Sequence, residues 1–322
     1  DNTDIGLAAN GVGDIPSFVV AGSSLVSETA TIEVTPTYEN NGVTCTGNSE
    51  TFTITVNPGA QVEAVTSQVL CVGESTDEIV FTTTNTDGIT TYEWTNDNTD
   101  IGLAANGVGD IPSFVVAGSS LVSETATIEV TPTYENNGVT CTGNPETFTI
   151  TVNPGAQVEA INSQLLCVGE STDEIVFATT NTDGTTTYEW TNDNTDIGLA
   201  ANGVGDIPSF TVTNDTTSTL IATIEVTPTY ENNGIICSGN SETFTITVNP
   251  SAQVEAVDSQ VLCVGESTDD IVFATTNTDG TTTYEWTNDN TDIGLAANGV
   301  GDIPSFTVTN DTTSALIATI EV

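Results

Sequence analysis

The chain has no lysine, arginine, histidine or methionine among its 322 residues. Its 45 acidic side chains have no basic partner, and the formal net charge is -45. No side-chain salt bridge can form, and Ser-His-Asp triads, Schiff bases and phosphate clamps are excluded. The negative charge also repels nucleic acids and anionic membranes. We therefore expect no enzyme activity and no nucleic-acid partner. Each carboxylate must be solvated, bonded to backbone N–H groups or hydroxyls, or bound to a cation.

Long apolar runs are also absent. No run is long enough to cross a bilayer, and neither a signal peptide nor an initiator methionine opens the sequence. We expect no membrane insertion in this segment. We interpret it as a piece of a longer polypeptide whose targeting segments lie elsewhere.

A repeat of 96 residues dominates what is present. Asp1, Asp97, Asp193 and Asp289 each begin the phrase DNTDIGLAANGVGDIPSF, in steps of 96 residues (97 − 1, 193 − 97, 289 − 193). This period exceeds the rungs of solenoids, which measure about 20–50 residues, and matches a small domain. Hydrophobic residues make up 37% of the chain, which distinguishes it from a disordered acidic tail.

Alternation of apolar and polar residues predicts strands in each repeat. In residues 59–154 the strand candidates are Gln61–Val65, Glu78–Thr83, Thr90–Thr95, Ser113–Val116, Ala126–Thr131 and Thr147–Val152. Turn signals such as Asn106-Gly107 and Asn136-Asn137-Gly138 separate them. Tyr92 and Trp94 share one strand face and should form the aromatic centre of the core. The pattern predicts an all-β fold, a tandem array of Ig-like antiparallel β-sandwiches with about seven strands each.

The repeat boundaries are predicted at an Asn-Pro dipeptide, because proline cannot continue a central strand. It occurs at Asn57-Pro58, Asn153-Pro154 and Asn249-Pro250. The expected domains are residues 59–154 and 155–250 as complete repeats. Residues 1–58 would be the C-terminal part of one repeat and 251–322 the N-terminal part of another.

Each repeat carries two cysteines at fixed spacing, which favours oxidised pairs and an extracellular compartment. Pairing within a domain would join Cys71 to Cys141 and Cys167 to Cys237, leaving Cys45 and Cys263 without partners in this sequence. The alternative joins neighbouring repeats through Cys45–Cys71, Cys141–Cys167 and Cys237–Cys263. The cysteine count cannot choose between them, and we expect the within-domain pattern because each domain should fold alone.

Calcium is the one cofactor that the acidic turns suggest, since calcium prefers oxygen ligands. The candidates are Asp97, Asp100 and Asp110 with the counterparts Asp193 and Asp196, and Asp87 lies in a nearby turn. Their spacing does not fit an EF-hand. The alternative, which we favour, is that these side chains cap turns through the local backbone.

Two sequons mark candidate glycosylation sites. Asn214-Asp215-Thr216 and Asn310-Asp311-Thr312 fit the N-glycosylation pattern. Thr216 and Thr312 also fit an Asp-Thr/Ser-x pattern for O-glycan attachment. An unmodified loop is the alternative, because such short motifs arise by chance.

Several phrases of each repeat resemble a known family. They are YEWTNDN from Tyr92, IGLAA from Ile101, IPSF from Ile111 and TFTITVNP from Thr147. Together they resemble the PKD-like (Ig-fold) repeats of giant Bacteroidota cell-surface proteins, similar to gliding-motility adhesins of the SprB type. The resemblance implies type IX secretion, location at the cell surface and an extended adhesive role.

We therefore expect a structural segment of a large secreted adhesin. Its partners would be other repeats of the same chain, with surface glycans or like filaments as further candidates. Two alternatives stay open. One is an array of carbohydrate- or protein-binding modules, and the other is a self-assembling extracellular fibre.

Overall fold

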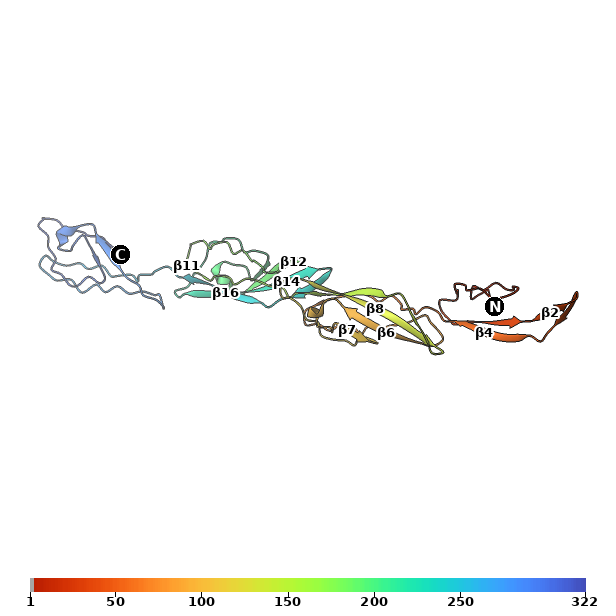
Figure 1. Ribbon diagram of the computed structural model, residues 1–322. Helices are drawn as coiled ribbons and strands as arrows, with labels where there is room; N and C mark the ends of the chain where they lie inside the picture. The colour runs from red at the N-terminus through yellow and green to blue at the C-terminus, as the bar shows by residue number, and fades with distance from the viewer. Residues whose placement is uncertain (1–2) are drawn as a thin grey trace. The chain divides into compact units, whose positions relative to one another are not determined.

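A computed structural model of the chain describes residues 3–322, and the predicted all-β class is confirmed within them (Figure 1). Asp1 and Asn2 lie outside the described residues. The strands are β1 (Glu28–Val34), β2 (Thr37–Asn40), β3 (Val43–Thr46), β4 (Glu50–Val56), β5 (Gln68–Cys71), β6 (Ile89–Asn96), β7 (Asn106–Val108), β8 (Glu124–Asn136), β9 (Val139–Thr142), β10 (Glu146–Asn153), β11 (Gln164–Cys167), β12 (Thr185–Asn192), β13 (Asn202–Val204), β14 (Leu220–Asn232), β15 (Ile235–Ser238), β16 (Glu242–Asn249), β17 (Glu285–Asn288), β18 (Asn298–Val300) and β19 (Ile320–Glu321). Three 3-10 helices are η1 (Thr99–Ile101), η2 (Thr195–Ile197) and η3 (Thr291–Ile293).

The chain divides into two compact units that do not follow the repeat boundaries. The first unit comprises Asp1–Gln157, Thr180–Thr186 and Thr229–Gly239. The second comprises Val158–Thr179, Thr187–Pro228 and Asn240–Val322. Two short segments of the repeat 155–250 thus pack with the preceding residues. The predicted domain limits themselves stay a prediction.

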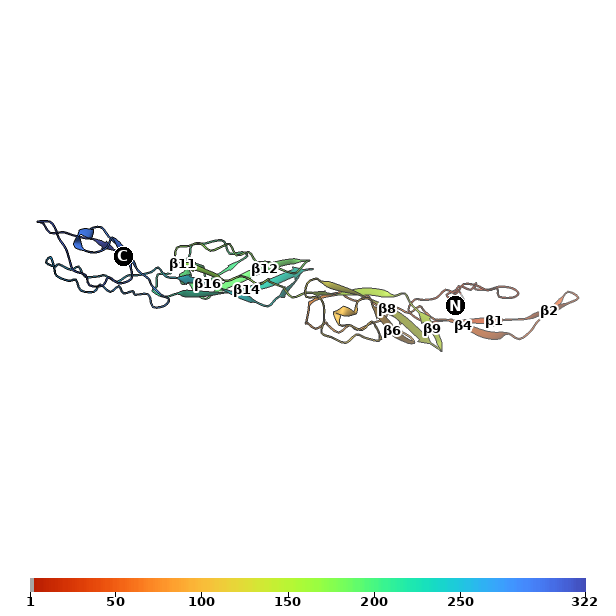
Figure 2. The ribbon, with the colours of Figure 1, turned by 60° about the vertical axis from the view of Figure 1, so that its left-hand side comes forward.

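One mixed sheet forms the centre of residues 59–154. Its strand order is β5-β10-β8-β6-β7, and β9 pairs with β8. The same order, β11-β16-β14-β12-β13 with β15 on β14, recurs in residues 155–250. β8 lies beside β6 in Figures 1 and 2. β5 runs parallel to β10, whereas we predicted antiparallel pairing throughout.

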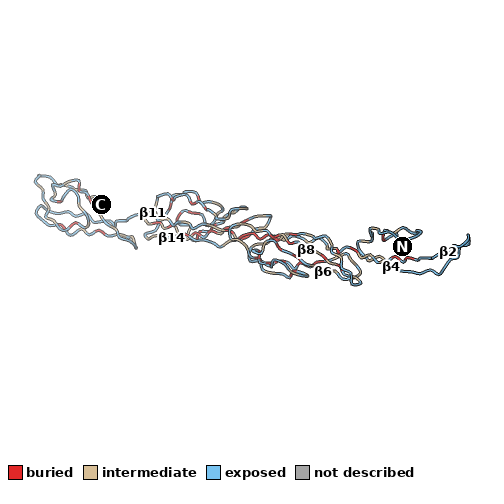
Figure 3. The backbone as a smooth tube through the Cα atoms, viewed as in Figure 1, coloured by how far each residue is buried: buried red, intermediate tan, exposed pale blue. Residues whose placement is uncertain are grey.

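Alternation places the core where the sequence predicts it. Phe148 and Ile150 of β10 face Ile128 and Ala126 of β8 across the antiparallel ladder, and all four side chains are buried. Figure 3 shows buried residues along β8. An equivalent core fills residues 175–248, and smaller clusters form around Ile5 and Phe273.

Three predicted strands are instead extended segments of the second layer. Gln61–Val65, Glu78–Thr83 and Ser113–Val116 form no regular strand, and isolated bridges join Ser75 to Val115 and Ile79 to Ile111. The physical reason is side-chain competition for the backbone amides. The carboxylate of Asp110 accepts from the amide of Phe81 at 2.8 Å, a bond that a neighbouring strand would otherwise make. These segments still cover the core of the sandwich: Ile79, Phe81 and Val116 belong to its buried cluster, and Val62 and Val65 pack against it.

The packing of Trp94 explains a second difference between the predicted and the observed secondary structure. Asn106-Gly107, predicted as a turn, lies in β7, with Gly107 paired opposite Trp94. A Cβ on Gly107 would lie 2.2 Å from Cζ2 of the Trp94 ring, so the glycine admits the indole. Trp94 is buried and Tyr92 packs against the same core, which confirms the predicted aromatic centre.

Candidate functional site: the junctions between successive repeats

The β14–β15 hairpin carries a buried tyrosine paired with a buried cysteine. Its turn residues Asn233 and Gly234 have φ of 53° and 77°, the left-handed values of a type I′ turn. Tyr230 and Cys237 are directly opposed across the hairpin and are 0% and 1% exposed. The hairpin tip, Thr229–Gly239, belongs to the first compact unit. This repeat therefore buries its hairpin against residues of the preceding repeat.

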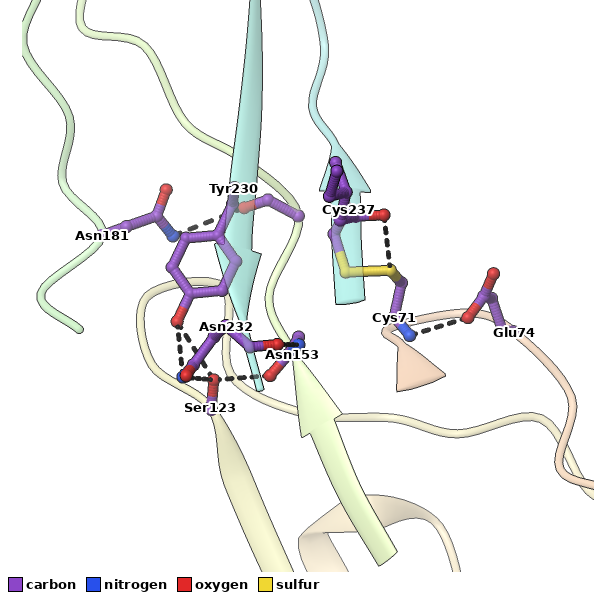
Figure 4. The surroundings of a disulfide bond; sticks show 10 residues. Cys71, Glu74, Ser123, Asn153, Asn181, Tyr230, Asn232 and Cys237 are labelled. Carbon is purple, nitrogen blue, oxygen red and sulfur yellow. Dashed lines mark hydrogen bonds between the residues drawn. A yellow bond between two sulfur atoms is a disulfide. The ribbon is translucent and has the colours of Figure 1, made fainter. Parts of the chain in front are cut away.

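A disulfide joins the hairpin to the preceding repeat. Cys237 is bonded to Cys71 at the end of β5, 166 residues earlier, with the two Cα atoms 5.6 Å apart (Figure 4). That separation lies in the usual range for disulfides. The backbone N–H of Cys71 donates to the Glu74 carboxylate at 2.7 Å.

Both predicted pairing schemes are therefore wrong in the structure. Cys237 lies against β5 of the preceding repeat, in the first unit, whereas its expected partner Cys167 belongs to the second unit. Cys141, the expected partner of Cys71, forms no disulfide. Among residues 3–322 the cysteines outside a disulfide are Cys45, Cys141, Cys167 and Cys263.

A polar cluster accompanies the disulfide, and we call it the Ser123 network. Figure 4 shows its members Ser123, Asn153, Tyr230 and Asn232, and Asp183 is the fifth. The Ser123 amide donates to both carboxylate oxygens of Asp183 at 3.3 and 3.1 Å. Tyr230 donates its hydroxyl to Asp183 at 2.9 Å. Asn232 donates to the hydroxyl oxygens of Ser123 and Tyr230 at 2.8 and 3.2 Å. The network thus joins five side chains from two successive repeats.

The same arrangement recurs one repeat earlier, in the Ser27 network of Ser27, Asn57, Asp87, Tyr134 and Asn136. The Ser27 amide donates to Asp87 at 3.2 and 2.9 Å, and the Ser27 hydroxyl lies 3.1 Å from that of Tyr134. Asn57 donates to the carbonyl of Asn136 at 3.0 Å.

A third junction, in the second unit, keeps part of the pattern. The amide of Thr219 donates to Asp279 at 2.9 Å, and its hydroxyl donates to Asn249 at 3.1 Å. A backbone bond accompanies it, from the amide of Thr278 to the carbonyl of Thr217 at 3.0 Å.

Electrostatics at the junctions follow from these bonds. The backbone N–H of Ser27 lowers the pKa of Asp87, and that of Thr219 lowers the pKa of Asp279, because each donates to the charged carboxylate. Burial raises the pKa of Tyr230. Asp87 and Asp279 are therefore ionised, and Tyr230 is neutral, at neutral pH.

The calcium candidates do not converge on one point. Asp97 accepts from the amide of Thr127 at 2.6 Å, and Asp110 accepts from that of Phe81 at 2.8 Å. The amide of Asp100 donates to Asn98, which caps η1. Across residues 3–322, no three acidic or cysteine side chains gather in a way that could hold a metal ion. Asp193 likewise accepts from a backbone amide, that of Thr223, and Asp196 is the middle residue of η2 as Asp100 is of η1.

The glycosylation candidates differ in access. Asn214 is 5% exposed, and its amide nitrogen donates to the carbonyls of Ser218 and Val248 at 2.9 and 2.8 Å. A glycan on that nitrogen does not fit the folded chain. Asn310 is half-buried, whereas Thr216 and Thr312 are exposed. O-glycans on these threonines stay a prediction.

Sequence reasoning missed the junction networks, although one signal for them exists. The segment 115–125 and its counterpart 211–221 differ at most positions, yet a hydroxyl persists at Ser27, Ser123 and Thr219. Such persistence in a variable segment indicates a contact that the scaffold needs. The Asn-Pro boundaries supply a second member of each network, Asn57, Asn153 and Asn249.

Comparisons with known proteins give loose likenesses only. No family model matches the sequence, and neither does any curated protein. Human protocadherin-24 EC1-2 is 15% identical with a TM-score of 0.30, over 61% of this chain and 100% of that one. Drosophila N-cadherin EC1-4 is 12% identical with a TM-score of 0.30, over 89% and 77% of the chains. Mouse cadherin-23 EC22-24 is 9% identical with a TM-score of 0.31, over 72% and 79%. The β class of the chain rests on its own sheets.

Among the described residues no helix has the length and apolar character needed to span a membrane.

Proposed function

We propose that this chain is a structural segment of a large secreted cell-surface adhesin, and that its repeats transmit force rather than perform chemistry. The observation that carries this function is the recurrence of one polar junction at Ser27, Ser123 and Thr219, each 96 residues apart (123 − 27, 219 − 123). Ligand binding by separate domains does not require the same contact between every pair of successive repeats. A chain that bears tension does require it, because the weakest junction between repeats limits the force that the chain can carry.

Two further features support the proposed location. The Cys71–Cys237 disulfide fits an oxidising, extracellular compartment. The absence of lysine and arginine leaves no cleavage site for trypsin-like proteases, which suits exposure outside the cell. Type IX secretion and a part in gliding motility belong to the same proposal and rest on the PKD-like phrases of the repeat.

The rival function, recognition of carbohydrates, needs outward aromatic side chains. In the two central repeats the aromatics Phe81, Trp94, Phe148, Phe177 and Trp190 are buried in the cores. The structure therefore favours the structural role over an array of binding modules.

The test is surface labelling of the source cells. Antibodies against residues 1–322 should label unpermeabilised cells. Treatment of intact cells with chymotrypsin should release the antigen, whereas trypsin should not cut within this segment. Labelling that appears only after permeabilisation would overturn the proposed location. A strong, specific hit for the purified chain on a glycan array would favour the binding-module alternative.

A further inference from the structure

The disulfide relates two cysteines of different kinds. Within each repeat one cysteine stands at the position of Cys71, which ends β5; Cys167 ends β11 in the same way, and Cys263 occupies the equivalent position in a segment that forms no regular strand. The other lies in the hairpin equivalent to β15, as Cys45, Cys141 and Cys237 do. The bridge joins the first kind in one repeat to the second kind in the next, over 166 residues.

We propose that this register is general in the repeat: each β5-type cysteine pairs with the hairpin cysteine of the following repeat, 166 residues on. Cys71 and Cys237 are the single pair at that separation within positions 1–322. The other four cysteines are the four that form no disulfide. Both rival schemes would have given Cys141 a partner here, either Cys71 or Cys167.

Both halves of the bridge site are preformed at other repeats. On the strand side, the amides of Cys71, Cys167 and Cys263 donate to Glu74, Glu170 and Glu266 at 2.7, 2.7 and 2.6 Å. On the hairpin side, Cys141 opposes Tyr134 as Cys237 opposes Tyr230. Tyr134 and Tyr230 are both 0% exposed, so the hairpin of residues 134–143 packs on the preceding repeat in the same way.

Bridges in this register would limit how far an oxidised array extends under tension. The span from Cys71 to Cys237 includes Cys167, so a bridge from Cys167 to the next repeat would begin inside the first loop and interleave with it. The shortest covalent path would then leave Cys237 and re-enter a bridge at Cys263, 26 residues later (263 − 237), once per two repeats. Unfolding a repeat could lengthen such an oxidised array very little. Reduction would release it.

Formation of each bridge is an ordinary thiol–disulfide exchange. Two thiols lose two protons and two electrons as their sulfurs join, and a disulfide-bonded exchange partner accepts both and becomes a dithiol. The proposed register states only which cysteines pair with one another. Its failure would leave the surface location unaffected, because cell labelling does not depend on which cysteines pair.

Counting thiols in the full chain tests the register. The chain is denatured without reduction and alkylated, and its six cysteines are assigned by mass spectrometry after digestion with glutamyl endopeptidase and chymotrypsin. The proposed register leaves four free thiols and one peptide pair joining Cys71 to Cys237. Within-repeat pairing would leave two, and the neighbour scheme would leave none. Either of those counts would overturn it.

Two variants sharpen the test. Cys71→Ser should abolish the only bridge and leave all five remaining cysteines free, whereas within-repeat pairing would keep Cys167–Cys237 and leave three. A chain in which residues 155–250 are duplicated in tandem should gain one bridge, from Cys167 to the hairpin cysteine of the added repeat, and keep four free thiols. A gain of any other linkage would overturn the register.

Single-molecule extension gives an independent readout. Reduction of the natural chain should add about 560 Å of contour length, from the 166 residues spanned by the bridge at about 3.4 Å each. Cys71→Ser should show that full length without reductant. An oxidised chain that already extends fully would contradict the bridge.

Discussion

Replacement of Tyr230 by phenylalanine should loosen the junction without disturbing either core. The substitution removes one oxygen atom from a fully buried side chain. That hydroxyl donates to the carboxylate group of Asp183 at 2.9 Å and accepts from Asn232 at 3.2 Å. Loss of a hydrogen bond to a charged group costs about 1.5–3 kcal/mol, and Asn232 also loses an acceptor. The ring itself stays, so no cavity of consequence forms.

Hydrogen exchange at the Ser123 amide measures this opening directly, because that amide donates to Asp183. A change of about 1.5–3 kcal/mol corresponds to roughly 10- to 150-fold faster exchange when opening is in rapid equilibrium. The amide of Thr182, which donates to the carbonyl of Leu121 at 3.1 Å, should accelerate with it. Exchange in the β8–β10 ladder should not change.

The chain supplies its own matched control. Tyr38 occupies the equivalent position of the first segment but is 66% exposed. Tyr38→Phe should therefore leave exchange at Ser123 unchanged. Tyr134→Phe should accelerate Ser27 and spare Ser123. Unaltered protection of Ser123 in Tyr230→Phe, or an equal loss in Tyr38→Phe, would refute the role assigned to the Ser123 network.

Three further outcomes are expected. The pKa of Asp87 is lower in the folded chain than in the unfolded chain. Its contribution to the free energy of unfolding is therefore fully present above the ordinary aspartate pKa of about 3.9 and is lost as the pH falls through the lower folded pKa. An NMR titration of the Ser27 amide with a midpoint at or above about 3.9 would contradict this. Gly107→Ala forces a Cβ to 2.2 Å from Trp94 and should lower the free energy of unfolding by about 1–3 kcal/mol or more, whereas Gly11→Ala, the equivalent change in open space, should cost far less in urea titrations. Calcium should raise the melting temperature no more than magnesium at equal ionic strength, because the carboxylates of Asp97, Asp110 and Asp193 already accept from separate backbone amides; a calcium-specific rise measured by calorimetry would contradict this and indicate a metal site.

The strands were predictable wherever burial alternates strictly. β8 and β10 appear where Ala126–Thr131 and Thr147–Val152 predict them, because a one-residue slip would turn the buried face to solvent. β5 was not predicted, because its four residues show no alternation of apolar and polar side chains. Gln61–Val65 was predicted as a strand and is not one, since its only ladder-like bond runs from the amide of Glu63 to the carbonyl of Thr82.

The disulfide could not be predicted from the sequence, for a reason of symmetry. Two cysteines 70 residues apart (141 − 71) and two cysteines 166 residues apart occupy the same two positions of the 96-residue repeat. The sequence is therefore the same for both pairings. Only the packing of a hairpin on the preceding repeat distinguishes them. That packing depends on contacts such as Ser123 to Tyr230, 107 residues apart, which no local pattern encodes.

The composition explains why the junctions are built as they are. Successive repeats that carry only negative charge repel one another, and no cation on the chain can bridge them. The acids at the joins, Asp87, Asp183 and Asp279, therefore bind backbone amides of Ser27, Ser123 and Thr219. Hydrogen bonds from backbone amides to carboxylates are directional, and salt screens them less than it screens exposed ion pairs. The disulfide beside one of these junctions adds a covalent link between repeats, which charge repulsion cannot break. Hydrogen-bonded carboxylates and a disulfide thus do at these joins what salt bridges do in chains with both charges.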